Sequence, residues 1–273
     1  MIESILVATD GSEASANAER CAIAHAAKLG IRLSGLSIVE DRDVRAPASD
    51  GLSLPPFPET DLAAYCRARA EAVVRRFSER ARAEGVEAAA EVAQGVADDR
   101  IVEKGQAADL VVVGRDGKST NGRGALIGST ASGLIRKNAK ATLVVPAGAP
   151  VSGPIVLGFD GSEGSRLAAN VAVHLANGLG EAVHVFVDSK DKSRAQARFE
   201  EVRQLVGGLS VPMRETASTL GRPDVKMVDA AREARAGLIV MGAFARNRIT
   251  DFFLGSNAAS VVRTAPCAVL LAR

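Results

Sequence analysis

The sequence lacks several features that mark common classes of protein. Its 273 residues include no tryptophan and one tyrosine, and aromatic residues make up 3% of the chain. Few rings are therefore available to stack on unpaired bases. The 34 basic residues nearly balance the 32 acidic ones, so the formal net charge of +2 supplies no strong field for a phosphodiester backbone. We therefore expect no nucleic acid partner.

Long hydrophobic runs are also missing. No stretch approaches the roughly 18 consecutive apolar residues of a membrane-spanning helix, and the first residues do not form a secretion signal. We therefore expect a soluble, cytoplasmic protein without a membrane partner. The three cysteines, Cys21, Cys66 and Cys267, lie far apart and form no Cys-x-x-Cys pair, which argues against a disulfide framework and against a metal site.

An internal repeat organises the chain. The segment ILVATDGSE at 5–13 returns as IVLGFDGSE at 155–163, and DLVVVG at 109–114 returns as GLIVMG at 237–242. Such a repeat predicts two similar units joined by a short segment rich in proline and glycine. We place the two domains at residues 1–148 and 153–273.

Continuous apolar runs alternate with helical stretches in both repeats. Residues 5–8 and 110–113 are typical of strands covered on both faces, and residues 14–29 are typical of a helix. We predict an α/β protein of two doubly wound five-stranded parallel-sheet domains, Rossmann-like, with strand order 3-2-1-4-5. Each repeat ends in an apolar strand that would otherwise be an exposed edge. We therefore expect the two domains to pair within the chain about a pseudo-twofold axis, and a homodimer stays open.

The strand order predicts where a ligand binds. In an open parallel sheet the crevice forms where the order reverses, outside the carboxyl ends of the first and fourth strands. Asp10-Gly11-Ser12 follows the first strand, and a glycine-rich stretch at 114–130 follows the fourth. Unhindered N–H groups before a helix favour phosphate, and Arg115 adds a positive charge. The alternative is a surface loop that binds nothing.

Sharper catalytic motifs are absent from this region. Gly117-Lys118-Ser119 is similar to the end of a Walker A loop, but position 112, where that motif requires glycine, is Val112. No nucleophile with an adjacent base can be assembled, so we predict no catalytic residues and at most slow hydrolysis of a bound ligand.

These motifs, in fixed order and present twice, resemble the universal stress protein family in its tandem form over nearly the whole chain. The ATP-binding branch of that family carries G-x2-G-x9-G-[ST] after the fourth strand. The resemblance maps this pattern onto Gly114, Gly117, Gly128 and Ser129, with one extra residue before Gly128. In the second repeat Ala245 replaces the second glycine.

The resemblance implies a site for ATP with a phosphate-bound magnesium ion. Asp10 and Asp160 would approach the ribose and adenine, and backbone near Ile38 and Val187 would meet the base. Asp10 could equally cap the helix that follows it, and Ser129 or Thr130 would cap the helix after the glycine-rich stretch. The nucleotide-binding residues implied are Ala8, Thr9, Asp10, Ile38, Val113, Gly114, Arg115, Gly117, Gly128, Ser129 and Thr130, then Asp160, Val187, Gly242, Ala245, Gly255, Ser256 and Asn257.

The function implied is a cytosolic stress-response protein that binds ATP between the first and fourth strands, with nucleotide-dependent regulation rather than fast catalysis. The alternative is a dimerisation and interaction scaffold of the same family that binds no nucleotide, which Ala245 and the extra residue before Gly128 favour. A third possible function is that of an ATP-dependent transferase or pyrophosphatase. Such an enzyme needs a Ser-Gly-Gly-x-Asp-Ser loop, which is missing after the first strand.

Overall fold

A computed structural model of the chain describes residues 2–40, 59–116, 127–219, 221–243 and 254–273. Strands and helices alternate along the chain, as the sequence predicts. The elements are β1 (Ser4–Ala8), α1 (Glu13–Leu29), β2 (Arg32–Val39), α3 (Glu59–Ala83), β3 (Ala88–Gln94), α4 (Ala97–Gly105), β4 (Leu110–Gly114), α5 (Ser129–Lys137), β5 (Ala141–Val145), β6 (Ile155–Gly158), α6 (Glu163–Leu179), β7 (Val183–Asp188), α7 (Lys192–Val206), β8 (Met213–Ser218), α8 (Pro223–Glu233), β9 (Leu238–Gly242), α9 (Ser256–Thr264) and β10 (Ala268–Ala272).

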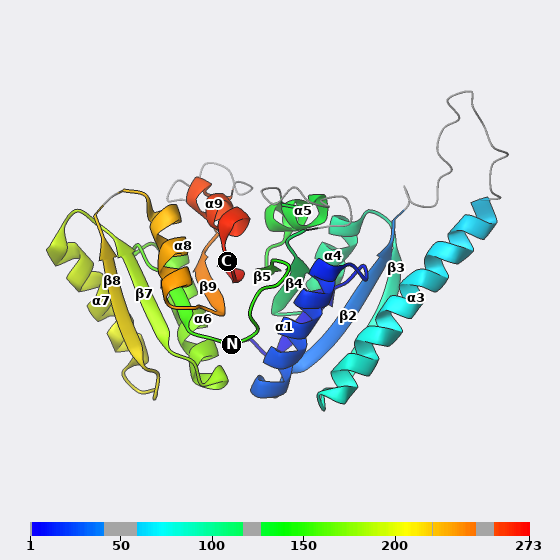
Figure 1. Cartoon of the computed structure of the whole chain (residues 1–273), viewed down its shortest axis with the longest axis horizontal. Helices are drawn as coiled ribbons and strands as arrows, with labels where there is room; N and C mark the ends of the chain where they lie inside the picture. The colour runs from blue at the N-terminus through cyan, green and yellow to red at the C-terminus, as the bar shows by residue number, and fades with distance from the viewer. Residues whose placement is uncertain (1, 41–58, 117–126, 220, 244–253) are drawn as a thin grey trace, which may run out of the picture.

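The strands form one ten-stranded sheet in the order β3-β2-β1-β4-β5-β10-β9-β6-β7-β8 (Figure 1). Each half therefore has the predicted order 3-2-1-4-5, and its strands pair in parallel. The two halves meet at an antiparallel pair, in which Val144 of β5 lies opposite Val269 of β10. The predicted pairing of the two halves thus takes the form of a continuous sheet, which covers both apolar edge strands.

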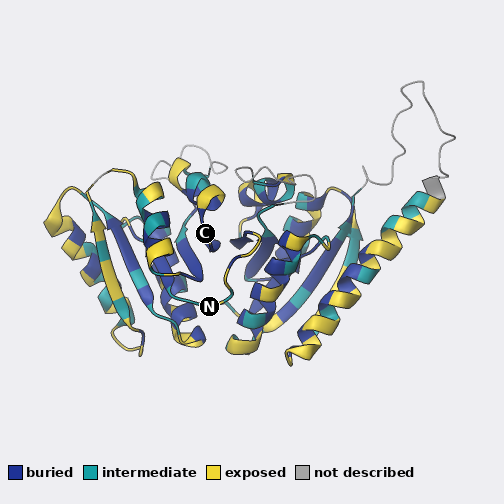
Figure 2. Ribbon diagram, in the orientation of Figure 1, coloured by how far each residue is buried: buried dark blue, intermediate teal, exposed yellow. Residues whose placement is uncertain are grey.

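Alternate residues of each strand enter two separate cores, because successive side chains point to opposite faces of a sheet. Val7 of β1 packs into the core beneath α1, α3, α6 and α7. Its neighbour Leu6 packs into the core beneath α4, α5, α8 and α9. Figure 2 shows the buried strands between helices whose outer surfaces are exposed. Coverage of both faces explains why the strands are continuous apolar runs.

The sequence repeat produces the same local structure twice. Helix α1 begins after Ser12, whose Oγ accepts a hydrogen bond from the N–H of Ser15 at 3.2 Å, and it ends at Gly30 with φ of 64°. Helix α6 begins after Ser162 in the same way and ends at Gly180 with φ of 70°. A serine cap and a left-handed glycine thus set the bounds of both helices.

Helix α3 lies at the outer end of the first half (Figure 1). Its fully buried Phe77 covers Gly35 of β2, where an added Cβ would lie 2.4 Å from the ring. This close contact fixes the helix on the strand. Among the described residues, no helix is both long enough and apolar enough to cross a membrane.

Candidate functional site

A cavity of about 300 Å³ opens at the carboxyl ends of β1 and β4, where the strand order of the first half reverses. This is the crevice that the sequence predicts. The turn after β1, the end of β2, the start of α4 and the start of α5 also contribute to its walls. Of the residues predicted for the first repeat, those lining the cavity are Ala8, Thr9, Asp10, Ile38, Val113, Gly114, Gly128, Ser129 and Thr130.

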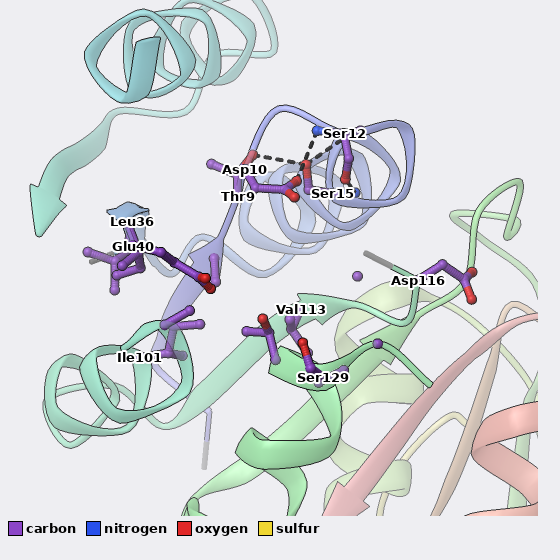
Figure 3. Close-up of a pocket in the computed structure, with 17 residues that line it drawn as sticks. Thr9, Asp10, Ser12, Ser15, Leu36, Glu40, Ile101, Val113, Asp116 and Ser129 are labelled. Atoms are coloured by element: carbon purple, nitrogen blue, oxygen red, sulfur yellow. Dashed lines mark hydrogen bonds between the residues drawn. The ribbon is translucent and has the colours of Figure 1, made fainter. Parts of the chain in front are cut away.

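The cavity has two chemically different ends. Figure 3 shows Leu36, Glu40 and Ile101 gathered at one side, and Ser129 and Asp116 at the other. Asp10 and Ser12 lie above the space between them. The apolar side chains of Leu36 and Ile101, with the carboxylate of Glu40 beside them, therefore face the amino terminus of α5 across the same space.

Asp10 holds the turn between β1 and α1. Its Oδ1 accepts a hydrogen bond from the N–H of Ser12 at 2.9 Å, and Ser12 in turn caps α1. The cap that the sequence allowed for Asp10 is thus provided by Ser12. Asp160 and Ser162 make the same 2.9 Å contact in the second half.

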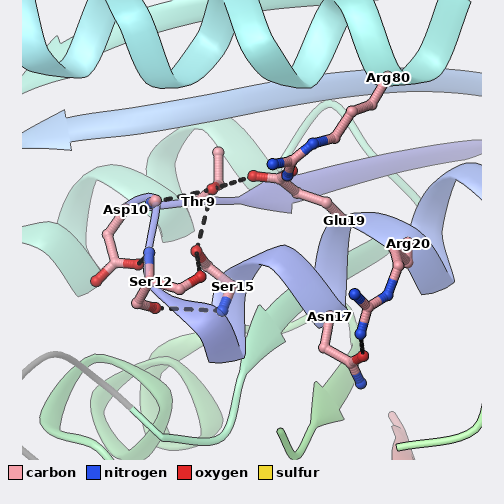
Figure 4. Close-up of polar contacts among 9 residues, drawn as sticks. Thr9, Asp10, Ser12, Ser15, Asn17, Glu19, Arg20 and Arg80 are labelled. Carbon is pink, nitrogen blue, oxygen red and sulfur yellow. Dashed lines mark hydrogen bonds and ion pairs between the residues drawn. The ribbon is translucent and has the colours of Figure 1, made fainter. Parts of the chain in front are cut away.

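A buried polar network lies behind Asp10 (Figure 4). The carboxylate of Glu19 on α1 is almost fully buried, and it accepts hydrogen bonds from the hydroxyl of Thr9 and from Nη1 of Arg80 on α3. Oγ1 of Thr9 also lies 3.2 Å from Oγ of Ser15. The network ties β1, α1 and α3 together directly beside the cavity, which fixes the position of the Asp10 turn.

The start of α5 has no side-chain cap within the described part of the chain, and its N-cap is Gly128. The predicted cap by Ser129 or Thr130 is therefore wrong, because both residues already lie inside the helix. The N–H of Gly128 donates to the main-chain oxygen of Arg115 at 2.8 Å. The N–H groups of the first helical turn have no partner within the helix, so they can bind an anion.

Gly114 has a packing role at the same place. An added Cβ would lie 3.0 Å from the main-chain carbon of Ala14 in α1. At Gly242 the corresponding distance, to Gly164 in α6, is 2.8 Å. Both glycines therefore let the first turn of a helix cross the end of a strand, which closes the cavity on that side.

Arg115 does not line the cavity, although the sequence places it there. Its guanidinium points toward the other half and donates to main-chain oxygens at the end of α9. Two further predicted residues, Gly117 and Ala245, lie outside the described residues.

A second cavity of about 360 Å³ occupies the equivalent place in the second half. Val187 is buried in the core instead of lining it, because it points to the opposite face of β7 from its neighbours Phe186 and Asp188, which do line the cavity. The predicted residues that line it are Asp160, Gly242, Gly255, Ser256 and Asn257.

Several lining residues of the first cavity escaped sequence reasoning, among them Ser15, Leu36, Glu40 and Ile101, whereas Ser12 and Asp116 belong to the two segments that the sequence placed there. The period of two along β2 could have identified Leu36 and Glu40, which flank Ile38 on the same face of the strand. Within the described part of the chain, no three His, Cys, Asp or Glu residues are grouped so as to hold a metal ion.

Comparisons with known proteins agree with this geometry. The model of the Universal stress protein family matches residues 1–146 and, a second time, residues 152–273. The chain belongs to this family.

Other universal stress proteins resemble the chain over different lengths. One from Thermus aquaticus is 36% identical over 133 residues, which cover 44% of this chain and 97% of the relative. One from Mycobacterium tuberculosis is 31% identical over 192 residues, which cover 63% of this chain and 64% of the relative, just under two thirds of its length.

A crystal structure of a universal stress protein from Archaeoglobus fulgidus superimposes on the whole fold. The TM-score is 0.81 at 18% identity, and the match covers 100% of this chain and 99% of that chain. At this level of identity the likeness concerns the fold alone. The two proteins share the same fold over both halves, including the tandem arrangement.

Proposed function

We propose that this universal stress protein is a cytosolic stress-response protein whose first cleft binds ATP together with magnesium. The observation that carries the proposal is the convergence of Asp10, after β1, and the uncapped start of α5, after β4, on one cavity. A carboxylate accepts hydrogen bonds from ribose hydroxyls, and free N–H groups at a helix terminus bind phosphate.

The two ends of the cavity suggest how the nucleotide lies. The base fits against the apolar side chains of Leu36, Ile38 and Ile101, which all line the cavity. The phosphates fit at Ser129 and Thr130, whose N–H groups belong to the first turn of α5. Asp10 lies between the two ends (Figure 3), and we assign it to the sugar.

Magnesium would reach the site with the phosphates. Three carboxylates, those of Asp10, Glu40 and Asp116, line the cavity, and no lysine or arginine is among its described lining residues. Carboxylates repel phosphate, so a divalent cation that neutralises part of the phosphate charge favours binding. The chain offers no cage of its own for the ion among the described residues.

Nucleotide occupancy then regulates the protein rather than supporting turnover. The described lining residues of the cavity include no histidine, cysteine or lysine that could activate water or act as a nucleophile. Binding instead joins the start of α1 to the start of α5. A ligand that contacts both helices favours the conformation in which they are close together.

Isothermal titration calorimetry with ATP and magnesium tests the proposal. We expect Asp10→Ala and Gly128→Glu to weaken binding at the first cleft, the second because it puts a negative side chain at the phosphate end. Gly208→Glu is the matched control, since an added Cβ at Gly208 meets nothing within 4 Å. Absence of any ATP binding by the wild-type chain would reject the proposal in favour of a scaffold that binds no nucleotide.

A further inference from the structure

The second cleft differs from the first at the place where the base of a nucleotide would lie. Leu36 and Phe186 occupy equivalent positions on β2 and β7, each paired with the last residue of the central strand of its half. Two residues farther along, Ile38 lines the first cavity and Asp188 lines the second. A carboxylate in the second cleft therefore replaces an apolar side chain in the first.

One oxygen of this carboxylate has no partner in the described part of the chain. Oδ1 of Asp188 is buried and accepts no hydrogen bond from a described residue. The other two carboxylates of the cavity are engaged: Asp160 accepts from the N–H of Ser162 at 2.9 Å, and Asp224 accepts from Oγ of Ser260 at 2.8 Å. A buried acceptor without a donor is unfavourable, so a ligand gains binding energy if the Asp188 carboxylate turns to present this oxygen to the cavity and the ligand donates to it.

The walls around Asp188 suit a planar ring. Phe186, Met227 and Met241 line the second cavity. In the first half the equivalent positions carry aliphatic side chains. Aromatic and thioether groups make favourable contacts with the face of a flat base.

The opposite end of the cavity suits phosphate. Helix α9 starts at Ser256 with Gly255 as its N-cap, and no side chain among the described residues caps it. Gly255, Ser256 and Asn257 all line the cavity. The second cleft thus keeps the phosphate end of the first cleft but has a different base end.

We propose that the second cleft selects a guanine nucleotide, and that Asp188 determines this specificity. The inference rests on the proposed function, because it takes both clefts to hold nucleotides. Guanine presents two neighbouring donors, N1–H and the 2-amino group, which match the two oxygens of a carboxylate. Adenine presents the lone pair of N1 beside its 6-amino group, so one carboxylate oxygen would face another acceptor.

The Gly128→Glu chain, in which we expect binding at the first cleft to be weakened, lets calorimetry measure the second cleft. We titrate it with GTP, ITP and ATP, each with magnesium. ITP keeps the N1–H donor but lacks the 2-amino group, so we expect affinity to fall in the order GTP, ITP, ATP. One bidentate contact corresponds to a preference for GTP over ATP of about tenfold to a hundredfold.

Two substitutions test the role of Asp188 itself. Asp188→Asn keeps the shape of the side chain but places a donor where guanine also donates, so we expect the preference for GTP to disappear. Asp188→Ile restores the residue of the first cleft, and we expect it to shift the preference toward ATP. Thermal unfolding, monitored by circular dichroism, verifies that each variant is folded. The titrations with GTP, ITP and ATP use a chain that keeps Asp188, so they test the specificity even if an Asp188 variant does not fold.

The outcomes separate this inference from the proposed function. Affinity for GTP no greater than for ATP in the Gly128→Glu chain, or an unchanged ratio after Asp188→Asn, overturns the guanine specificity. Gly255→Glu is the equivalent substitution at the second cleft. Titration of this chain with ATP measures binding at the first cleft. Retained ATP binding there leaves the proposed function standing when the guanine preference fails.

Discussion

Nη1 of Arg115 donates a hydrogen bond to the main-chain oxygen of Ala265, 3.2 Å away, across the boundary between the two halves. The same nitrogen donates to the oxygen of Arg263 at 3.1 Å. In the opposite direction, Arg273 of the second half donates to main-chain oxygens at the end of α5. Each half thus places a positive charge at the carboxyl end of a helix in the other half, where the helix dipole favours it.

Arg115→Ala should lower the free energy of unfolding by about 1–3 kcal/mol, because it removes a donor from the partly buried main-chain oxygen of Ala265 and from the exposed one of Arg263. Arg136→Ala removes an exposed arginine from α5 and serves as the control. Urea denaturation measures both. Arg115 also pairs at 3.2 Å with Asp116, which lines the first cavity, so we expect ATP affinity to fall modestly when this carboxylate loses its cation. A variant as stable as the wild type that no longer binds ATP would contradict this role.

Asn17 should be important for holding the linker between the halves. It is fully buried, and its Nδ2 donates to the main-chain oxygens of Pro146 at 3.0 Å and Ala149 at 3.2 Å. Asn17→Ala leaves the oxygen of Ala149 without this donor and leaves Pro146 only the N–H of Ala149, so we expect a loss of about 1–3 kcal/mol in the free energy of unfolding. Asn170→Ala, at an exposed asparagine of α6, should change stability by less than about 0.5 kcal/mol in the same urea titration.

Gly114→Ala should disturb the site through packing. The new Cβ would lie 3.0 Å from the backbone of Ala14, so the start of α1 must move away from β4. We expect a loss of about 1–3 kcal/mol in stability together with weaker ATP binding, because the shift also moves Asp10. Gly208→Ala, in open space, is the control for both measurements. Wild-type melting temperature and affinity in the Gly114 variant would refute the close contact.

Stability should fall at mildly acidic pH because of His25. Burial, assisted by the positive charge of Lys28, lowers the pKa of His25 from 6.5 to about 4. Between those values the unfolded chain binds more protons than the folded chain, so stability decreases as pH falls from 6.5 to 4. The loss attributable to His25 is roughly 2–4 kcal/mol.

Urea titrations of wild type and His25→Gln across this pH range measure that contribution. Lys28 and Glu181 line the same small cavity as His25 and stay unchanged in the variant. We expect the stability of the variant to depend less steeply on pH, whereas His174→Gln, at an exposed histidine, should follow the wild type. Identical slopes for His25→Gln and wild type would show that His25 is not the cause.

ATP turnover should be very slow. The described residues of the first cavity include carboxylates and hydroxyls but no histidine, cysteine or lysine. We therefore expect a rate far below the roughly 1 per second at the low end of ordinary enzymes. Phosphate release from ATP with magnesium measures it, and a rate in the ordinary range would instead support the ATP-dependent transferase or pyrophosphatase.

Much of the fold can be predicted from the sequence because the same pattern of apolar runs and helical stretches occurs in both repeats. The runs at 5–8 and 110–113 predict β1 and β4 to within one residue, and the glycines after α1 and α6 fix where those helices end. The joining of both halves into one sheet follows from their apolar last strands, as predicted. These features depend on local chemistry, which the sequence displays directly.

The site is harder to predict because side-chain direction and long-range contacts decide it. Backbone near Val187 was predicted to meet the base, but alternation along β7 turns the Val187 side chain into the core, so Asp188 supplies the side chain that lines the cavity. Arg115 lies beside the glycine-rich stretch in sequence, yet its partner oxygens belong to residues about 150 positions farther along the chain. The contact between Glu19 and Arg80 joins two helices whose packing no local pattern encodes.

A crystal structure of the full chain grown with ATP and magnesium is the most direct test of the central claim. We predict nucleotide density in the first cleft, with the base against Ile38, the sugar near Asp10 and the phosphates at the N–H groups of Ser129 and Thr130. Crystals grown at saturating ATP in which this cleft is empty, or in which the nucleotide lies elsewhere on the molecule, would contradict it.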